Sequence, residues 1–322
     1  MSDASSVGAT ERVESVALRS VDGSTEAEFV PEANMICSSL RYLGEEYLHR
    51  GDGVGAYLRE GKTMGIPLLH PWANRLNGFR YRVACEEVAL PRGERLIFLD
   101  DVGLPIHGAA PALMRWEVAR LCATSLTARL RWTSGVLLRL FPFPHELTVD
   151  ATVESGALTI VTTLAPIGQK SVPVSFGYHP YLRIPEEERS EWQVTLGARE
   201  RLLLDDAMIP TGEREPAARQ RFTLAEQVLD DGFGAVDVPA AFQAAAGDVA
   251  LTVGFLEGYS YAQVFAPAGT DFICFEPMTA PTNALVSGEG LELVAPGDQY
   301  RAAFRVSISG ASRSDAANVV QR

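Results

Sequence analysis

A histidine stands between two tyrosines and directly before a proline in SFGYHPY, the stretch Ser175–Tyr181. Proline cannot donate to a β-ladder, so a strand is expected to stop or to become an edge here. Side chains at the end of a strand leave the sheet and can line a binding or catalytic site. Because imidazole titrates near neutral pH, His179 is a candidate proton donor or acceptor. A histidine with satisfied hydrogen bonds in the core or on the surface is the alternative interpretation.

A glutamate in the stretch FEPMTAPTNAL is a candidate for the opposite role. Glu276 follows the apolar run Phe272–Phe275 and precedes a proline. A carboxylate at the end of an apolar strand is expected to lose part of its hydration, which raises its pKa. The pattern therefore favours Glu276 as a general base that works near pH 7, although a glutamate in this context can also be an ordinary surface residue.

Two polar residues follow a histidine and a proline in GIPLLHPWANRLNG. Asn74 and Arg75 come after the apolar approach that ends at His70–Pro71. The arginine guanidinium is a planar fork of donors that suits sugar hydroxyls or carboxylates. A structural salt bridge to a nearby acid would use the same donors, and His70 is either a ligand contact or a turn residue.

Two more stretches place polar side chains beside a glycine. In LPIHG, His107 precedes a glycine at a turn where the backbone can approach a ligand closely. In LDDGF, Asp230 and Asp231 precede a glycine. Aspartate is common in turns because its side chain bonds the nearby backbone, so this pair is equally typical of a plain turn.

The composition restricts the class of ligand. The 322 residues include 28 basic and 41 acidic side chains, which give a formal net charge of −13. A chain this acidic repels a nucleic-acid backbone and an anionic membrane surface, and it shows no basic stripe. We therefore expect a small neutral ligand, with no nucleic-acid partner and no membrane association. The sequence does not indicate an oligomeric state.

The compartment follows from the N-terminal stretch and the cysteines. The start MSDASSVGATERV has no apolar core of a signal peptide, and no apolar run reaches the length of a membrane span. Four scattered cysteines form no CxxC pair, so we expect free buried thiols, neither disulfides nor a thiolate zinc site, and a cytoplasmic protein.

Short segments with strand patterns recur along the chain, and helix-period stretches are scarce. In LTARLRW apolar and polar residues alternate, and in LTIVTTL the apolar residues are more continuous. About fourteen strands with short links predict an all-β fold, a large antiparallel β-sandwich with little helix. The predicted strands are Val13–Arg19, Glu28–Val30, Asn34–Ser39, Phe79–Val83, Arg95–Phe98, Ser125–Trp132, His145–Val153, Leu158–Leu164, Val172–Phe176, Trp192–Leu196, Val249–Gly254, Ala262–Phe265, Phe272–Phe275 and Tyr300–Ile308.

The remaining segments complete the predicted organisation. PAAFQAAAG, Pro239–Gly247, is the best helix candidate, and Glu186–Ser190 and Gly212–Arg219 are expected to be exposed loops. No Pro-rich or Gly/Ser-rich linker divides the chain, so one domain over residues 1–322 is predicted. Its polar ends, residues 1–12 and 311–322, are expected to fray.

Taken together and in this order, the motifs resemble the aldose 1-epimerase (galactose mutarotase) family. The histidine–proline–tyrosine stretch and the EP…PTNA stretch are the most specific parts, and the resemblance extends from about the first strand to residue 308. The matching elements are Asn74–Arg75, His107–Gly108, FPFPH at Phe141–His145, PVSFGYHPY at Pro173–Tyr181, PTG at Pro210–Gly212, Asp230–Phe233, Glu276–Leu285 and Pro296–Gly297.

The resemblance implies a large sandwich with a concave site and the interconversion of the α and β anomers of a free aldose, with no metal and no cofactor. It also implies a role for each matched residue. His179 would be the general acid, Glu276 the general base and His107 a hydrogen-bonding partner near the ring oxygen. The implied substrate-binding residues are Arg75, Asn74, Asp230 and Tyr181, and Trp72 and Tyr178 are further aromatic candidates for the sugar face or for the core.

Several alternatives stay open at this stage. His107, His179 and Glu276 are also the ligand types of a two-histidine, one-carboxylate metal oxygenase. A non-catalytic sugar-binding protein fits the same residues, and so does a glycoside hydrolase that uses Glu276 with Asp230 or Asp231. Residues 109 and 110 are alanines where relatives often carry a bulky side chain, and residue 182 is a leucine in place of the usual aromatic residue. The identity of the sugar is therefore not fixed.

Overall fold

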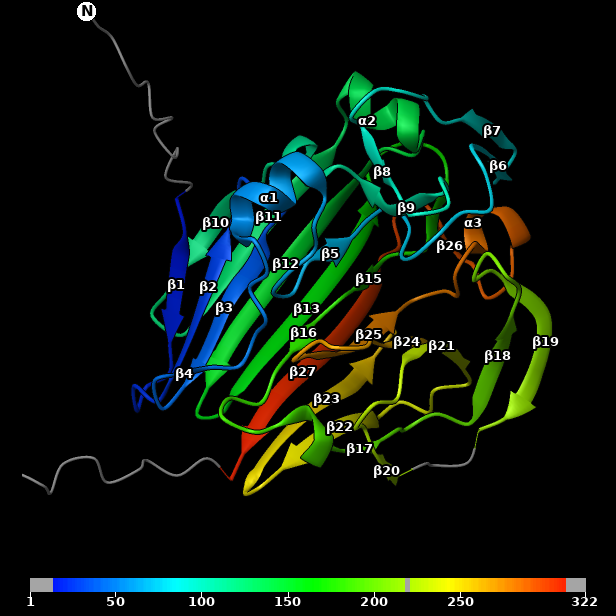
Figure 1. The fold of residues 1–322 in the computed structure, drawn as a ribbon. Coiled ribbons are helices and arrows are strands. Elements are labelled where there is room, and N and C mark those ends of the chain that lie inside the picture. Colours follow the sequence, from blue (N-terminus) through cyan, green and yellow to red (C-terminus); the bar gives the residue numbers. More distant parts are fainter. Residues whose placement is uncertain (1–13, 218–220, 311–322) are drawn as a thin grey trace, which may run out of the picture.

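A computed structural model of the chain describes residues 14–217 and 221–310. The ends that were expected to fray, residues 1–12 and 311–322, lie outside the described residues, as does the first residue of the strand predicted from Val13. Within those residues the fold consists mainly of antiparallel strands (Figure 1), and the predicted all-β antiparallel sandwich with little helix is confirmed.

The larger of the two main sheets has nine strands. β12, β13 and β27 run side by side through its centre (Figure 1). In spatial order the strands are β10 (Glu117–Leu121), β11 (Ser125–Trp132), β12 (His145–Glu154), β13 (Ala157–Pro166), β27 (Tyr300–Ser309), β23 (Val249–Glu257), β22 (Ala240–Ala246), β17 (Gln193–Thr195) and β20 (Arg221–Thr223).

The second main sheet has eight strands and carries several of the motifs that resemble the family, among them Asp230–Phe233 and Glu276. Its path is β19 (Pro210–Pro216), β18 (Glu200–Leu204), β21 (Leu229–Gly234), β24 (Tyr261–Ala266), β25 (Ile273–Met278), β15 (Gly177–Tyr178) and β5 (Leu68–Leu69), with β16 (Tyr181–Leu182) also paired to β25.

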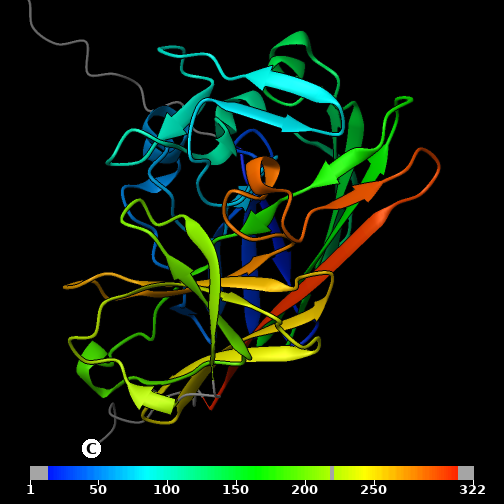
Figure 2. The same cartoon turned by 90° about the vertical axis from the view of Figure 1, so that its right-hand side faces the viewer.

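Smaller sheets and short helices surround these two. A four-stranded sheet, here called the first sheet because it comes first in the chain, consists of β1 (Val16–Arg19), β2 (Thr25–Val30), β3 (Ile36–Tyr42) and β4 (Glu45–Glu46). The two-stranded sheets are β6 (Arg80–Val83) with β7 (Glu86–Ala89), β8 (Ile97–Leu99) with β9 (Pro105–Ala109), and β14 (Val172–Val174) with β26 (Glu292–Val294). In the described residues the α-helices are α1 (Gly53–Glu60), α2 (Gly135–Leu140) and α3 (Ala284–Ser287), and the 3-10 helices are η1 (Pro111–Leu113) and η2 (Arg189–Glu191). Helix α3 lies beneath the β6–β7 hairpin in Figure 2.

One continuous apolar core joins the two main sheets. Alternate side chains of β11 and β13 are buried, as the period of a strand with one covered face requires. Trp132 and Phe304 from the nine-stranded sheet belong to the same buried cluster as Tyr178 and Phe275 from the eight-stranded sheet. The face-to-face packing of the sheets therefore supplies the rigid base for the site.

Several local predictions are wrong. Pro239–Gly247 was expected to be a helix, but Ala240–Ala246 is strand β22 between β17 and β23, because tertiary pairing outweighs the helix propensity of alanine. In the predicted loop Gly212–Arg219, residues 212–216 belong to the exposed strand β19, and residues 218 and 219 lie outside the described residues. Helix α1 was not predicted.

The cysteines are free, as predicted, in the part of the chain that the structure describes. The expectation that all of them are buried is wrong. Cys37 and Cys274 are buried, whereas Cys85 and Cys122 are exposed.

His70 belongs to the core and does not line the candidate site. His145 Nδ1 donates to the carbonyl oxygen of Phe143 at 2.6 Å, so its Nε2 must accept a hydrogen bond from His70 Nε2 at 2.9 Å. Burial lowers the pKa of His145 to about 4. Burial and the neighbouring His145 hold the pKa of His70 well below 6.5. Both rings are therefore neutral, and they link β12 to the segment before Asn74.

A glycine allows the backbone after His107 to approach the backbone of His70. Gly108 has φ +80°, and a Cβ placed on it would lie 2.1 Å from the carbonyl oxygen of His70. That oxygen accepts a hydrogen bond from the N–H of Ala109 at 2.9 Å. No side chain fits in this space, and the close approach fixes the position of His107.

We expect the protein to lose stability as the pH falls from 7 to 5. The unfolded chain protonates histidine near pH 6.5, whereas buried His145 resists protonation down to about pH 4, so stability is present above pH 6.5 and lost below it. In His145→Gln the fall in the free energy of unfolding should be smaller by about 2 kcal/mol. Urea unfolding at both pH values measures this, and an equal fall in the two proteins would contradict the assignment.

We also expect Gly108→Ala to destabilise the fold and to displace His107. The left-handed backbone and the clash with the carbonyl of His70 together should cost about 2 to 4 kcal/mol in the free energy of unfolding. Gly78→Ala is the matched control, because no heavy atom lies within 4 Å of its added Cβ. Thermal unfolding of both variants tests the prediction, and equal melting temperatures would refute it.

Candidate active site

A cavity of about 330 Å³ opens beside the eight-stranded sheet, and its size suits a small ligand. All seven residues predicted from the sequence to form a site line this one cavity, although they are scattered over more than 200 positions of the chain. They are Asn74, Arg75, His107, His179, Tyr181, Asp230 and Glu276.

The pairing register of β25 brings His179 and Glu276 together. β25 is continuous, whereas its partner strand is broken into β15 and β16 at His179–Pro180. Because Gly177 pairs with Met278 and Tyr181 pairs with Cys274, the same register places His179 opposite Glu276 on one face of the sheet. His179 Nε2 lies 3.2 Å from Glu276 Oε1.

Burial controls the protonation of this pair. Burial and the carboxylate of Asp230 raise the pKa of Glu276 well above 4.5, and Arg75 offsets part of this rise. Burial, His107 and Arg75 hold the pKa of His179 well below 6.5. Ionisation of the Glu276 carboxyl and protonation of the His179 ring to the imidazolium are therefore both disfavoured. Burial therefore favours a neutral carboxyl on Glu276 beside a neutral His179, and their separation is short enough for a proton to pass between them.

Two atoms of the pair, both in residues that line the cavity, have no hydrogen-bond partner in the described part of the chain. Among the described residues, Glu276 Oε2 and His179 Nδ1 are buried and make no hydrogen bond, and the same is true of His107 Nδ1. Burial and the charge of Arg75 lower the pKa of His107 to about 3, so its ring is neutral. Unsatisfied buried polar atoms are costly unless a ligand uses them.

Backbone hydrogen bonds position the segment that carries Asn74 and Arg75. The N–H of His107 donates to the carbonyl of Asn74, and the carbonyl of Arg75 accepts from the N–H of Asn283, both at 2.9 Å. Asn283 Oδ1 also accepts from the N–H of Asn77 at 3.0 Å. The PTNA part of the family-like motif therefore holds Arg75 in place, while the EP part supplies Glu276.

Strand alternation separates the two neighbouring aspartates of β21. Asp230 lines the cavity, and its Oδ1 accepts a hydrogen bond from Gln263 Nε2 at 2.6 Å. Asp231 instead bonds Arg201 Nε at 3.0 Å outside the cavity. Burial and the charge of Asp231 raise the pKa of Asp230, although Gln263 and Arg75 counteract this.

Tyr181 is the only one of the three suggested aromatic residues that lines the cavity among the described residues. Its ring stacks on His179 with centroids 4.4 Å apart, and its hydroxyl bonds Thr63 Oγ1 at 2.5 Å. Trp72 is fully buried, and Tyr178 bonds Thr162 inside the core. Trp72 and Tyr178 thus support the sandwich and do not face a ligand here.

Several residues that line the cavity were not predicted from the sequence, and Asp100 is the most informative of them. Its Oδ2 bonds Arg75 Nε at 2.7 Å. The turn motif LDDVGLP around Asp100 was a usable signal, because an almost equal motif, LDDAMIP, contains Asp206, which also lines the cavity. The other lining residues that were missed are Gly61, Lys62, Thr63, Asp101, Val102, Ile106, Ala207, Met208 and Phe265.

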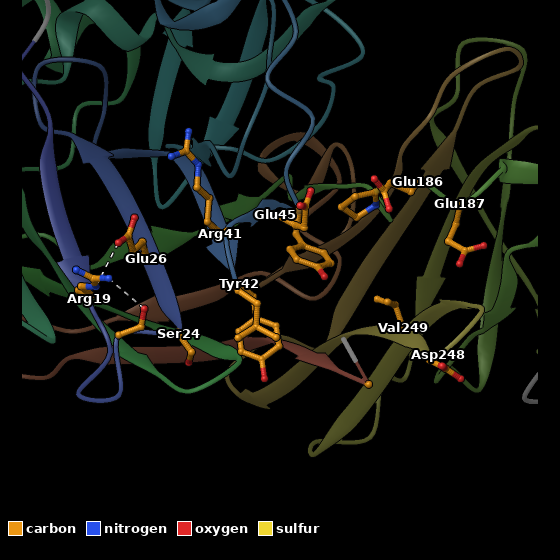
Figure 3. Close-up of a pocket in the computed structure, with 16 residues that line it drawn as sticks. Arg19, Ser24, Glu26, Arg41, Tyr42, Glu45, Glu186, Glu187, Asp248 and Val249 are labelled. Carbon is orange, nitrogen blue, oxygen red and sulfur yellow. Dashed lines mark hydrogen bonds and ion pairs between the residues drawn. The ribbon is translucent and has the colours of Figure 1, made fainter. Parts of the chain in front are cut away.

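A larger cavity, about 690 Å³, lies between the first sheet and the β22–β23 turn (Figure 3). None of the seven predicted residues lines it, and its described lining contains no histidine. Arg19 and Glu26, which the figure shows at one side, already pair with each other at 3.2 Å. Size alone therefore does not mark the site, and the smaller cavity carries the proton-transfer groups.

The described residues contain neither a metal-binding group of side chains nor a membrane-spanning helix. Across residues 14–217 and 221–310, no three His, Cys, Asp or Glu side chains are grouped in a way that could hold a metal ion, so His107, His179 and Glu276 do not form such a group. Over the same ranges, no helix has the length and apolar character needed to cross a membrane.

Comparison with known proteins agrees with the geometry. A model of the aldose 1-epimerase family matches residues 38–307. The protein YihR of Escherichia coli (strain K12), described as uncharacterized, is 25% identical over 261 residues, which cover 76% of this chain and 81% of that protein.

Solved structures share the fold at lower identity. The Slr1438 protein of Synechocystis sp. PCC 6803 superimposes with a TM-score of 0.78 at 23% identity, covering 97% of this chain and 100% of that one. A GalM/aldose epimerase homologue from C. elegans superimposes with a TM-score of 0.76 at 15% identity, covering 93% and 99% of the two chains. With most of its length matched by the family model, the chain belongs to the aldose 1-epimerase family.

Proposed function

We propose that this protein is an aldose 1-epimerase that interconverts the α and β anomers of a free aldose by acid–base ring opening, without a covalent intermediate. The observation that carries the proposal is the buried contact of 3.2 Å between His179 Nε2 and Glu276 Oε1 in the lining of a sugar-sized cavity. Family membership supports the reaction type.

Ring opening needs a base at the C1 hydroxyl and an acid at the ring oxygen. Glu276 would first pass its proton to His179 across the short contact between them. Its carboxylate would then remove the hydroxyl proton while the His179 imidazolium protonates the ring oxygen, and after rotation about the C1–C2 bond the two groups would exchange roles. The sequence analysis does not anticipate how close the two groups lie, 3.2 Å apart. Both reacting oxygens are bonded to the same carbon, so a base and an acid that lie side by side can reach them.

The remaining groups would bind and orient the sugar. Arg75 and Asp230 offer a charged donor and a charged acceptor for hydroxyl groups, and neutral His107 would bond near the ring oxygen. Asn74 and Tyr181 would complete the walls. Holding the sugar in this way would restrict motion to C1, which is the positioning contribution to catalysis.

The substrate class and the setting are part of the same proposal. We expect a free hexose or pentose, no metal and no cofactor, because proton transfer alone completes the reaction. A cytoplasmic location agrees with the free cysteines of the described residues.

Glycoside hydrolysis is the alternative with a specific observation in its favour. Glu276 and Asp230 both line the cavity, and the charge of Asp230 raises the pKa of Glu276, which is how a hydrolase keeps one carboxyl protonated. Release of reducing sugar from a disaccharide would favour this alternative. Anomer exchange without such release would favour the epimerase.

We expect Glu276→Gln and His179→Asn each to lower anomer exchange by about 10² to 10⁴-fold, because each removes one proton-transfer group. Polarimetry or NMR of freshly dissolved α-D-glucose and α-D-galactose measures the rate. Glu213→Gln, on exposed strand β19, is the control and should keep the wild-type rate. Wild-type rates in either site variant, with circular dichroism unchanged, would refute the roles assigned here.

We expect Asp230→Asn to raise the KM for the sugar by about tenfold or more, since a charged hydrogen-bond acceptor in the cavity is lost. Asp231→Asn changes the same charge at the next residue but on the side that bonds Arg201, so its KM should stay near that of the wild type. The comparison decides which aspartate binds substrate, and the reverse order of effects would assign that role to Asp231.

A further inference from the structure

Two hairpin turns with the same construction lie at the cavity. LDDVGLP spans residues 99–105 and LDDAMIP spans residues 204–210. In each, the first and last residues pair across the hairpin, Leu99 with Pro105 and Leu204 with Pro210. The fifth residue has a positive φ in both, +83° at Gly103 and +61° at Met208.

The first aspartate has the same structural task in both turns. Asp100 Oδ1 accepts from the N–H groups of Val102 at 3.1 Å and Leu104 at 2.8 Å. Asp205 Oδ1 accepts from Ala207 and Ile209, both at 2.9 Å. One carboxylate oxygen is therefore sufficient to close this type of turn.

The two turns differ in the second carboxylate oxygen. Asp100 Oδ2 bonds Arg75 Nε at 2.7 Å, and the exposed fractions of the two side chains are only 6% and 18%. Within the described residues, the hydrogen bonds of the Asp205 side chain come from the N–H groups of Ala207 and Ile209, and no arginine contact like that of Asp100 is seen. Because the Asp205 turn forms without such a contact, the ion pair of Asp100 is not needed to make the turn.

The ion pair fixes the orientation of the Arg75 guanidinium. Nε is held by Asp100, and Nη1 donates to Asn74 Oδ1 at 3.1 Å. Two partners therefore set the plane of the guanidinium beside the cavity. The charge of Arg75 also lowers the pKa of Glu276 and that of His179, and this charge is kept when only the orientation of the guanidinium changes.

We propose that Asp100 is a positioning residue that holds the Arg75 guanidinium in the plane from which it binds the hydroxyl groups of the aldose. Asp100 acts through Arg75 and donates no proton itself. This inference rests on the proposed function, because it assumes that Arg75 binds the sugar. It adds to the site a residue that was not assigned a role from the sequence.

The test compares Asp100→Asn with Asp205→Asn. Both amides keep an oxygen that can accept the two turn N–H groups, but only Asp100→Asn removes the charge that faces Arg75. We expect Asp100→Asn to raise KM by about tenfold with kcat changed less than about threefold. This pattern is expected when a mutation weakens binding of the substrate and of the transition state equally. Asp205→Asn should leave both constants near wild type. The assay uses whichever of α-D-glucose and α-D-galactose the wild-type protein converts faster.

A double-variant comparison shows whether Asp100 acts through Arg75. In an Arg75→Gln background, Asp100→Asn should change KM by less than about twofold, because the two losses are coupled. Equal effects of Asp100→Asn and Asp205→Asn would reduce Asp100 to a turn residue. A full tenfold effect that persists in the Arg75→Gln background would also overturn the proposal.

Binding of sugars that cannot open separates this inference from the proposed reaction. 1,5-Anhydro-D-glucitol and 1,5-anhydro-D-galactitol lack the anomeric hydroxyl, and NMR titration gives their Kd values. Weaker binding to Asp100→Asn than to Asp205→Asn supports the positioning role even if the wild type does not speed anomer exchange. Unchanged binding rejects the role, and so does a lack of binding to the wild type, in which case anomer exchange alone decides the proposed function.

Discussion

The site depends on the register in which β25 pairs with β15 and β16. Gly177 pairs with Met278 and Tyr181 with Cys274, so His179 and Glu276 meet on one face of the sheet. A shift of one residue would turn one of the two side chains to the opposite face. The proline after His179 breaks the partner strand at this point, so the imidazole leaves the ladder while its neighbours stay in it.

Burial gives this contact its chemical meaning. The same two side chains on the surface would titrate independently near their ordinary pKa values. Inside the cavity, the loss of hydration raises the pKa of Glu276 and lowers that of His179. Arg75, held by Asp100, supplies the nearby positive charge that moderates the effect on Glu276. The apolar core between the sheets makes this possible, because it keeps the supporting strands rigid and dry.

Many residues of the family-like motifs serve to position others. Gly108 lets strand β9, which carries His107, lie against the backbone of His70, and Asn283 holds the segment that carries Arg75. His70 and His145 join the same segment to β12 as a neutral hydrogen-bonded pair. A motif read only as chemistry would assign all of these to the site. The structure separates groups that face the cavity from groups that place them.

The sequence alone determined the all-β class, because strand patterns depend on neighbouring residues, and it located the seven residues of the candidate site through their local motifs. It did not determine which of Asp230 and Asp231 faces the cavity, that His70 pairs with His145, or that Ala240–Ala246 is a strand. It also did not show that Asp100 bonds Arg75. Each of these depends on strand register or on contacts between distant segments, and only tertiary packing fixes such contacts.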